Sequence, residues 1–282
     1  MFVPDGCRRL GQVHSLVLMR SGAQVSRLLG RGGARHTCWV SIPPTGPSPL
    51  VTGDAAIQNE VLEELAEAVN YRRWLVSLIE EQLGEDPLEV GSGTGEYAAS
   101  LSALGQSVTV SEAYGPRLHQ LQKRFAGDER VTVRGLVIPA NIEGEYSSVF
   151  AFNVLEHIPN DAAAVASMGR LVRPGGRVMV FVPAFRLLMS RFDRQVGHQR
   201  RYRAAELRRL VEGAGLAVEC LHHVNAPGFL AWLVGMRLLK GRPKDGPALR
   251  VWDRVVVPPT RRLESRHRPP FGQSLFVVGR RA

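Results

Sequence analysis

The feature that most constrains this chain is the glycine-rich segment 88–96, which reads L-E-V-G-S-G-T-G-E. Apolar residues run into three glycines at alternating positions, and a helical pattern of apolar residues follows as far as Gly105. This pattern predicts a strand, a tight turn and a helix. Glycine tolerates positive φ and exposes bare backbone, and a helix start adds unpaired N–H groups and a positive dipole end. The turn therefore suits a polar or anionic ligand group.

Two carboxylates narrow the choice of ligand. Dinucleotide-binding loops read G-x-G-x-x-G, whereas Gly91, Gly93 and Gly95 give G-x-G-x-G. Glu89 precedes the turn and would repel a pyrophosphate. Glu112 ends the next predicted strand, where a carboxylate can accept hydrogen bonds from both ribose hydroxyls. The pair favours a nucleoside with a cationic arm and no phosphates, and S-adenosylmethionine fits that description. The alternative is a tight turn that binds no ligand.

Composition and net charge limit the kind of protein that this chain can be. The chain has 282 residues, is 44% hydrophobic and carries a formal net charge of +10, mostly from arginine. Such a charge favours nucleic acid, phospholipid or phosphorylated partners. The three cysteines, Cys7, Cys38 and Cys220, are too far apart for a disulfide framework or a metal site. No apolar run reaches the roughly 18 residues of a membrane span. We expect a cytoplasmic protein, with peripheral contact to the inner membrane surface as an open alternative.

The chain divides by composition into an extension and one domain. Residues 1–52 hold six arginines against a single acid and end in a proline-rich stretch. We expect a basic, disordered extension, or a start codon placed too early. Residues 53–282 are predicted to form one domain with a helical insertion at about 226–270. In the segment 54–83, Asp54 can cap one long helix or two short ones that lean across the mouth of the sheet.

Strand and helix patterns alternate after the glycine turn. The predicted strands are 107–110, 131–138, 149–152 and 177–182, with helices between them that begin near Pro116 and at Asn160 or Asp161. This alternation predicts an α/β fold with a doubly wound, mostly parallel sheet. Ligands of such sheets bind beyond the carboxyl ends of the strands. The glycine turn, Glu112 and the residues after the fourth strand all fall on that edge.

Several motifs in this order resemble class I S-adenosylmethionine-dependent methyltransferases. They are the glycine loop, Glu112, N-V-L-E-H-I at 153–158 and L-V-R-P-G-G at 171–176. The resemblance covers roughly residues 55–282. N-Y-x-R-W at 70–74 and G-H-x-R-R-Y at 197–202 are similar to segments of bacterial small-molecule methyltransferases. The V-L-E-H-I run is also similar to ubiquinone-biosynthesis O-methyltransferases.

The resemblance implies a Rossmann-like, seven-stranded sheet whose last strand, Gln273 to Gly279, runs antiparallel. The helical segment 54–83 is expected to form an N-terminal helical lid. It places the methionine moiety of S-adenosylmethionine against the glycine loop and the ribose on Glu112. Cofactor contacts are therefore expected from the following residues: Tyr71, Glu89, Gly91, Ser92, Gly93, Gly95, Glu112 and Asn153. Tyr71 could equally be a core or lid aromatic. The acid that the family usually carries after the third strand is missing at 134–138, so adenine recognition is expected to use backbone groups.

Methyl transfer from a sulfonium is an in-line displacement, so the enzyme mainly aligns the reactants, and a hydroxyl acceptor benefits from a base. His157 and His198 are the candidate catalytic residues, although His157 could simply pack a turn and His198 could lie in a surface loop. Asp193 could orient either one. The segment 186–209 contains eight arginines. Arginine binds carboxylate or phosphate through two parallel hydrogen bonds. We therefore expect Arg200, Arg201 and Tyr202 to bind an anionic substrate group, with a solvated helix face as the alternative.

The predicted insertion begins with a nearly continuous apolar stretch at 226–239, followed by Lys240, Arg242 and Lys244. A short apolar helix with a basic flank can lie on an anionic membrane. It can equally cover the substrate pocket or form a dimer face.

The sequence thus predicts methyl transfer from S-adenosylmethionine to a small-molecule, glycan or lipid-linked acceptor at oxygen, without a metal. Nucleic-acid methylation is an alternative, disfavoured because the Asn/Asp-Pro-Pro-Tyr/Phe run of base-amino methyltransferases is replaced by N-V-L-E at 153–156. A non-catalytic, membrane-associated partner that retains the cofactor fold is a further alternative.

Overall fold

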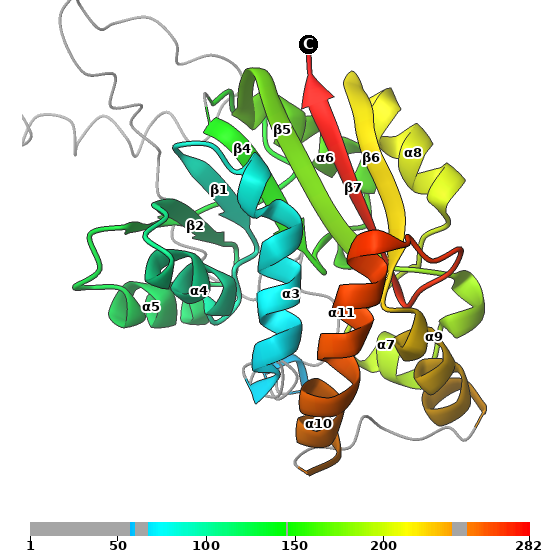
Figure 1. Ribbon diagram of the computed structural model, residues 1–282. Coiled ribbons are helices and arrows are strands. Elements are labelled where there is room, and N and C mark those ends of the chain that lie inside the picture. Colours follow the sequence, from blue (N-terminus) through cyan, green and yellow to red (C-terminus); the bar gives the residue numbers. More distant parts are fainter. Residues whose placement is uncertain (1–56, 60–66, 145, 239–246) are drawn as a thin grey trace, which may run out of the picture. The chain divides into compact units, whose positions relative to one another are not determined.

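The computed structural model describes residues 57–59, 67–144, 146–238 and 247–282 (Figure 1). The predictions made for residues 1–52 and for a cap at Asp54 lie outside these residues. The basic flank at Lys240, Arg242 and Lys244 does so as well. None of the helices in the described part of the chain is long and apolar enough to cross a membrane.

A seven-stranded sheet forms the centre of the fold, with the strand order β3-β2-β1-β4-β5-β7-β6. Strands β1 to β5 pair in parallel, and β7 runs antiparallel to both of its neighbours. The predicted doubly wound sheet with an antiparallel last strand is therefore confirmed. The strands are β1 (Pro87–Val90), β2 (Val108–Glu112), β3 (Val131–Gly135), β4 (Tyr146–Phe152), β5 (Val172–Pro183), β6 (Leu216–Val224) and β7 (Ser274–Arg281).

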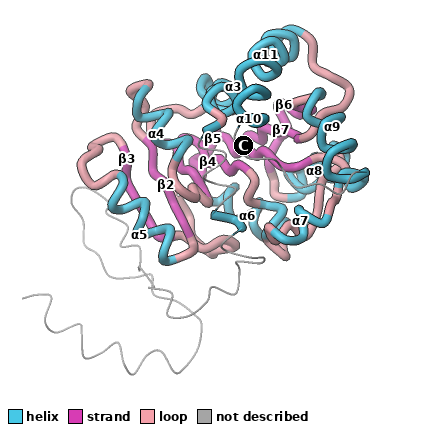
Figure 2. The backbone as a smooth tube through the Cα atoms, turned by 90° about the horizontal axis from the view of Figure 1, so that it is seen from below, coloured by secondary structure: helices cyan, strands magenta, loops and turns pink. Residues whose placement is uncertain are grey.

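Helices cover both faces of the sheet. Figures 1 and 2 show α3 and α11 on one face and α6 and α8 on the other. A group of helices between β6 and β7 contains the predicted insertion. The α-helices are α3 (Val69–Ile79), α4 (Glu96–Ala103), α5 (Gly115–Arg124), α6 (Asp161–Leu171), α7 (Arg191–Gln195), α8 (Ala204–Gly213), α9 (Ala226–Trp232), α10 (Pro247–Val251) and α11 (Val257–Arg266). Shorter helical segments are η2 (Glu80–Gln82), η3 (Leu155–His157), η4 (Arg186–Leu188), η5 (Leu233–Leu238) and η6 (Trp252–Val256).

The core lies between the central strands and α3. Trp74, Leu75 and Ile79 of α3 are buried against a cluster that includes Phe150 of β4 and Phe181 of β5. Every residue of β4 after Tyr146 is buried. A parallel strand covered on both faces reads as a continuous apolar run, which is why β4 was recognisable in the sequence.

Two strand boundaries differ from the prediction. The third strand ends at Gly135 instead of residue 138, because its ladder partner β2 ends at Glu112, which pairs with Gly135. The fifth strand begins at Val172 instead of Arg177, because Val172 pairs with Tyr146 across a register shift. The Pro174-Gly175-Gly176 stretch therefore lies within β5.

Candidate functional site

A cavity of about 660 Å³ lies at the carboxyl edge of the parallel strands. Its wall contains the last residues of β1, β2, β4 and β5, which are Val90, Glu112, Phe152 and Pro183. This is the edge at which doubly wound sheets bind their ligands. Side chains from α3, α9, α10 and η6 complete the wall.

The glycine loop adopts the backbone that its residues suggested. Gly91, Gly93 and Gly95 have φ angles of 70°, 56° and 82°, which strain residues with a side chain. A Cβ on Gly91 would stand 2.7 Å from Val154 Cγ2. The backbone N–H of Ser92 donates to the Ser111 carbonyl at 2.9 Å and fixes the loop to β2. All of these loop residues except Gly95 line the cavity.

Glu112 holds the loop and faces the cavity at the same time. Its Oε2 accepts a hydrogen bond from the Gly93 N–H at 3.0 Å. Its Oε1 accepts from the N–H groups of Ala113 and Tyr114 at 2.9 and 3.2 Å. A carboxylate offers about four acceptor positions. Glu112 thus keeps acceptor capacity toward the cavity, as a ribose contact would need.

Glu89 presents a buried oxygen that lacks a partner. The side chain is buried, and its Oε2 makes no hydrogen bond within the described structure. Burial raises the pKa of Glu89 to about 8; a hydrogen bond from Ser92 lowers it and the charge of Glu112 raises it. A buried carboxylate oxygen without a donor is costly until a donor or cation arrives. This unsatisfied oxygen in the cavity wall fits the cationic part of S-adenosylmethionine.

Tyr71 reaches the cavity because the first turn of α3 is hydrogen-bonded to the insertion. The N–H of Tyr71 donates to Asp253 Oδ1 at 2.8 Å, and the N–H of Asn70 donates to Oδ2 of the same residue at 3.0 Å. The Tyr71 ring contacts Trp74 edge-on, and burial raises the pKa of its hydroxyl. Asn153 also lines the cavity and has a φ of 53°, which asparagine tolerates better than most residues.

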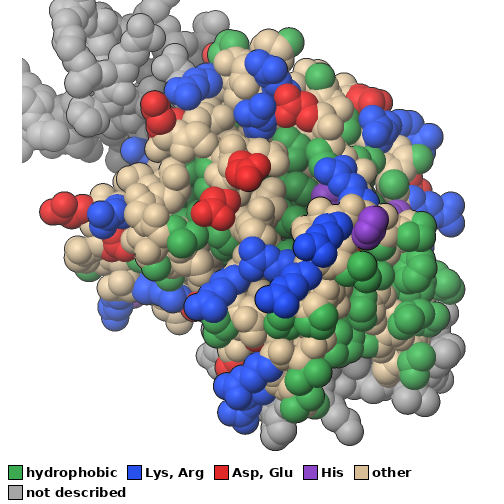
Figure 3. Space-filling model, in the orientation of Figure 1, with side chains coloured by type: hydrophobic (Ala, Val, Ile, Leu, Met, Phe, Trp, Pro, Cys, Tyr) green, Lys and Arg blue, Asp and Glu red, His purple; other side chains and the backbone are tan. Residues whose placement is uncertain are grey.

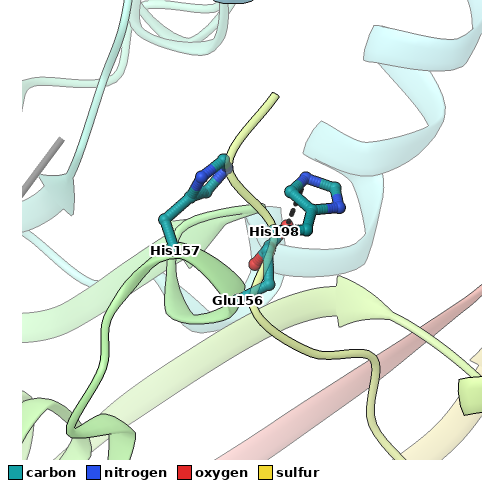
Figure 4. Close-up of side chains that lie close together, drawn as sticks. All are labelled: Glu156, His157 and His198. Carbon is teal, nitrogen blue, oxygen red and sulfur yellow. Dashed lines mark ion pairs between the residues drawn. The ribbon is translucent and has the colours of Figure 1, made fainter. Parts of the chain in front are cut away.

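The two candidate histidines lie side by side in the cavity wall, with ring centroids 4.7 Å apart. His157 and Glu156 project from η3, and His198 projects from the loop after α7 (Figure 4). His198 Nδ1 lies 2.9 Å from Asp193 Oδ1, and its Nε2 lies 3.8 Å from Glu156 Oε1. The ligand atoms of Glu156, His157 and His198 all lie within 4.8 Å of one another. A proton or a cation could be shared at this point.

Burial and neighbouring charges shift the pKa values of Glu156, His157 and Asp193 in different directions. Burial raises the pKa of Glu156 to about 7, and both of its oxygens lack a hydrogen bond. Burial, helped by the positive charges of His198 and Arg117, lowers the pKa of His157 to about 3. Burial alone would raise the pKa of Asp193, but contacts with His198, Arg201 and Ser190 outweigh it and hold that pKa well below its usual value. Sequence reasoning did not foresee a role for Glu156.

A family model described as a methyltransferase domain matches residues 58–221, which is more than half of the chain. The chain belongs to this methyltransferase family. It is an S-adenosylmethionine-dependent enzyme of class I, as the resemblance of its motifs implied. The loop and the two glutamates described above line one cavity, which suits that cofactor.

Sequence relatives include two bacterial ubiquinone biosynthesis O-methyltransferases. The protein from Pseudomonas paraeruginosa is 32% identical over 102 residues, which are 34% of this chain and 44% of the relative. The protein from Azotobacter vinelandii is 34% identical over 112 residues, which are 36% of this chain and 47% of the relative. The matched region thus spans less than half the length of these relatives.

Solved structures share the fold at low sequence identity. A Haloferax volcanii methyltransferase, solved in complex with the Trm112 methyltransferase activator, superposes with a TM-score of 0.54 at 13% identity, over 80% of this chain and 92% of that one. Geranyl diphosphate C-methyltransferase from Streptomyces coelicolor gives a TM-score of 0.52 at 12% identity, over 74% and 78%. Both support the fold prediction.

The arginine cluster of this methyltransferase does not face the cavity as a unit. Arg201 lines the cavity, but its guanidinium is buried against Asp193 Oδ1 at 2.7 and 3.0 Å and lies 4.9 Å from the Trp232 ring centroid. Arg200 and Tyr202 instead contact Asp161 Oδ2 in the first turn of α6, at 2.6 and 2.9 Å. Neither Arg200 nor Tyr202 lines the cavity, although binding of a substrate there would require it.

The reason lies in the local backbone. Tyr202 forms a bridge with Ala184 beside the end of β5, so this segment is extended. Neighbouring residues of an extended segment point in opposite directions. Arg201 therefore points inward, and Arg200 and Tyr202 point away from the cavity. A substrate role for Arg200 and Tyr202 stays a prediction that this geometry does not favour.

The remaining wall of the cavity is apolar and aromatic. It is formed by side chains from α7, α9, α10 and η6, namely Phe192, Val196, Trp232, Leu249 and Trp252. The place expected to recognise adenine is lined by Leu136 and Ile138, which is consistent with the missing acid. Sequence reasoning missed Leu249 and Trp252, because they lie far along the chain from every motif.

Proposed function

We propose that this methyltransferase transfers the methyl group of S-adenosylmethionine to an oxygen atom of a small, largely apolar acceptor. The supporting observation is that one cavity joins the two glutamates at the glycine loop to a histidine pair and an apolar wall. The names of the sequence relatives point in the same direction. Among the acceptors considered, the aromatic wall favours a lipid-linked or aromatic molecule over a bare glycan. A phosphate or carboxylate on the acceptor would be drawn to the positive net charge.

Two carboxylates and the glycine loop would hold the cofactor, which supplies an activated methyl group on a positively charged sulfur. Glu89 would face the cationic arm with its unpaired Oε2. Glu112 would accept hydrogen bonds from the ribose while it fixes the Gly93 amide. Tyr71, Ser92 and Asn153 would contact the nucleoside from the surrounding wall. The enzyme would thus contribute alignment of the acceptor oxygen with the methyl group.

His198 would act as the base that accepts the proton of the acceptor hydroxyl. The Asp193 carboxylate would accept a hydrogen bond from the Nδ1–H of His198, which leaves the lone pair of the neutral ring on Nε2. The imidazolium that forms when Nε2 takes a proton would lie between Asp193 and Glu156. The Asp193 carboxylate would stabilise its charge, and Glu156 would add to this above its raised pKa of about 7. His157 is a poorer base, because its low pKa keeps it neutral. We assign it a role in positioning the acceptor.

The remaining assignments follow from this function. We propose that residues 53–282 form the methyltransferase domain and that residues 1–52 are a basic extension without a part in catalysis. We also propose that the enzyme acts in the cytoplasm. A nucleic-acid acceptor is disfavoured, because the run after β4 reads N-V-L-E at 153–156 and lacks the Pro-Pro-Tyr/Phe pattern of base-amino methyltransferases.

Radiolabelled methyl transfer to fractionated extracts tests the proposal. The full chain would be incubated with methyl-labelled cofactor and with separate lipid, small-metabolite, glycan and RNA fractions. We expect label in the lipid or small-metabolite fraction that is released by reagents that cleave O-methyl bonds. Label confined to RNA would contradict the proposal. Cofactor binding without label in any fraction would favour the non-catalytic alternative.

A further inference from the structure

Four exposed hydrophobic side chains mark one surface beside the cavity. They belong to η4, α9, η5 and the loop before β7, and are Leu187, Leu230, Val234 and Phe271, with exposed fractions of 60%, 55%, 50% and 37%. We call this surface the apolar face. Figure 3 shows hydrophobic side chains gathered over α9, at the lower right of the molecule. Contiguous exposed apolar patches mark sites of interaction with proteins or membranes.

Aromatic contacts hold these elements together as one surface. The Phe229 ring lies 5.2 Å from the Phe271 ring and 5.3 Å from the Phe185 ring. The indole N–H of Trp232 donates to the Leu188 carbonyl at 3.0 Å, which joins α9 to η4. The apolar face is therefore pre-formed by packing.

Exposed arginines border the apolar face. Arg191 and Arg194 belong to α7, whose Phe192 ring lies 6.0 Å from the Trp232 ring of α9. Arg186 precedes Leu187, and Arg268 lies three residues before Phe271. An apolar surface bordered by cations matches the interface of an anionic bilayer, where each basic side chain near the surface contributes about 1 kcal/mol.

Helix α9 contributes side chains both to the apolar face and to the cavity wall. Gly228, Ala231 and Trp232 of α9 line the cavity, while Leu230 projects into solvent. Residues i and i+4 of a helix lie on one side, so Leu230 and Val234 share a side across the α9–η5 junction. An acceptor with an apolar tail could therefore stay in a bilayer while its head group enters the cavity.

Charge argues against the other possible occupants. A second copy of this chain would bring two arginine-bordered surfaces together in a two-fold contact, and each copy carries a net charge of +10. The extension at residues 1–52 is itself rich in arginine and would be repelled in the same way.

We propose that the apolar face binds the surface of an anionic lipid bilayer and presents the cavity to acceptors held in it. This inference goes beyond the proposed function, because bilayer binding requires neither cofactor nor catalysis.

Co-sedimentation of the full chain with lipid vesicles tests the inference. Vesicles that contain phosphatidylglycerol would be compared with vesicles of phosphatidylcholine alone, at low and high salt. We expect binding to the anionic vesicles that weakens with salt. The double variant Leu230→Ser with Val234→Ser should bind at least about tenfold more weakly, because it removes two of the four exposed apolar side chains of the face. Reversal of charge in Arg191→Glu with Arg194→Glu should weaken binding without changing the apolar face.

Leu104→Ser is the matched control, because Leu104 is a 61% exposed leucine after α4 and is outside the apolar face. It should bind vesicles as the wild type does. Equal binding to neutral and anionic vesicles, no binding to either, or wild-type binding by the double variant would overturn the inference. A dimer that only the double variant disrupts would also overturn it and assign the face to a second copy. Failure of methyl transfer with vesicle binding intact would count against the proposed function alone.

Discussion

His198 Nδ1 and Asp193 Oδ1 lie 2.9 Å apart in the cavity wall, and Asp193 is fully buried. Two further residues fix this carboxylate: Oδ1 also accepts from Arg201, and Oδ2 accepts from the N–H and the hydroxyl of Ser190. A carboxylate held in this way can set the tautomer of the imidazole and leave Nε2 as the basic atom. The choice of His198 as the base depends on this relationship.

His198→Asn should lower kcat by about 10²–10⁴-fold, the usual contribution of a general base, while the cofactor Kd stays within about twofold. His222→Asn is a matched control, since His222 lies in β6 and does not line the cavity. Steady-state kinetics and calorimetry measure the two quantities. Activity of the wild type should survive EDTA. Loss of activity in EDTA that divalent metal restores would assign the cluster of Glu156, His157 and His198 to a metal ion instead.

The stability of the free enzyme should fall as pH rises toward neutrality, because burial raises the pKa of Glu156 from 4.5 to about 7. The unfolded chain releases this proton at lower pH than the native one does, so the native state binds more protons within that window. The stability that the native state gains from protonated Glu156 is fully present below pH 4.5 and is lost as pH rises through about 7. Glu156→Gln should remove about 1–3 kcal/mol of this pH dependence. Urea unfolding at pH 5 and pH 8 measures this pH dependence. The same change of stability with pH in Glu156→Gln and wild type would show that Glu156 is ionised in the native state.

Arg201→Ala should reduce the free energy of unfolding by about 3–5 kcal/mol, because it removes the guanidinium that pairs with the buried Asp193 charge. Arg200→Ala should cost less than about 1 kcal/mol, since its pair with Asp161 is partly exposed. Denaturant titration of the two variants provides the comparison. Equal losses would mean that the buried pair is not the dominant interaction of this segment.

Gly91→Ala should weaken cofactor binding and stability more than Gly105→Ala does. Both glycines have positive φ, 70° and 83°, so both substitutions bear the backbone strain. An added Cβ meets Val154 at 2.7 Å in the first case and no atom within 4 Å in the second. The backbone strain costs about 1–2 kcal/mol in each variant, and the excess at Gly91 reports the contact. Matching thermal midpoints would show that the loop can move away from Val154.

The sheet and the conformation of the glycine turn could be predicted from the sequence. The glycine turn and Glu112 were recognisable because local chemistry demands them: three positive φ angles and an acid at the end of the next strand. The apolar run of β4 was recognisable because a strand buried on both faces has no polar positions. Interactions between distant segments could not be foreseen. Asn70 and Asp253 meet across 183 residues, and this contact brings Tyr71 and Trp252 to one cavity.

The arginine segment shows a second limit. Composition drew attention to residues 186–209, and a motif resemblance to residues 197–202, yet neither could say which side chain would face inward. That depends on the bridge between Tyr202 and Ala184 and on Asp161 in the first turn of α6. The same segment therefore contributes Arg201 to the cavity and directs Arg200 to the surface.

Calorimetric titration of the full chain with S-adenosylmethionine tests the central claim most directly, namely that the glycine loop and its two glutamates hold this cofactor. We predict saturable binding, and in Glu112→Ala a loss of about 1–3 kcal/mol of binding free energy from the missing charged acceptor. Glu129→Ala, which alters an exposed acid outside the cavity, should bind as the wild type does. Absence of heat at millimolar cofactor, or equal affinity in Glu112→Ala and wild type, would contradict the account.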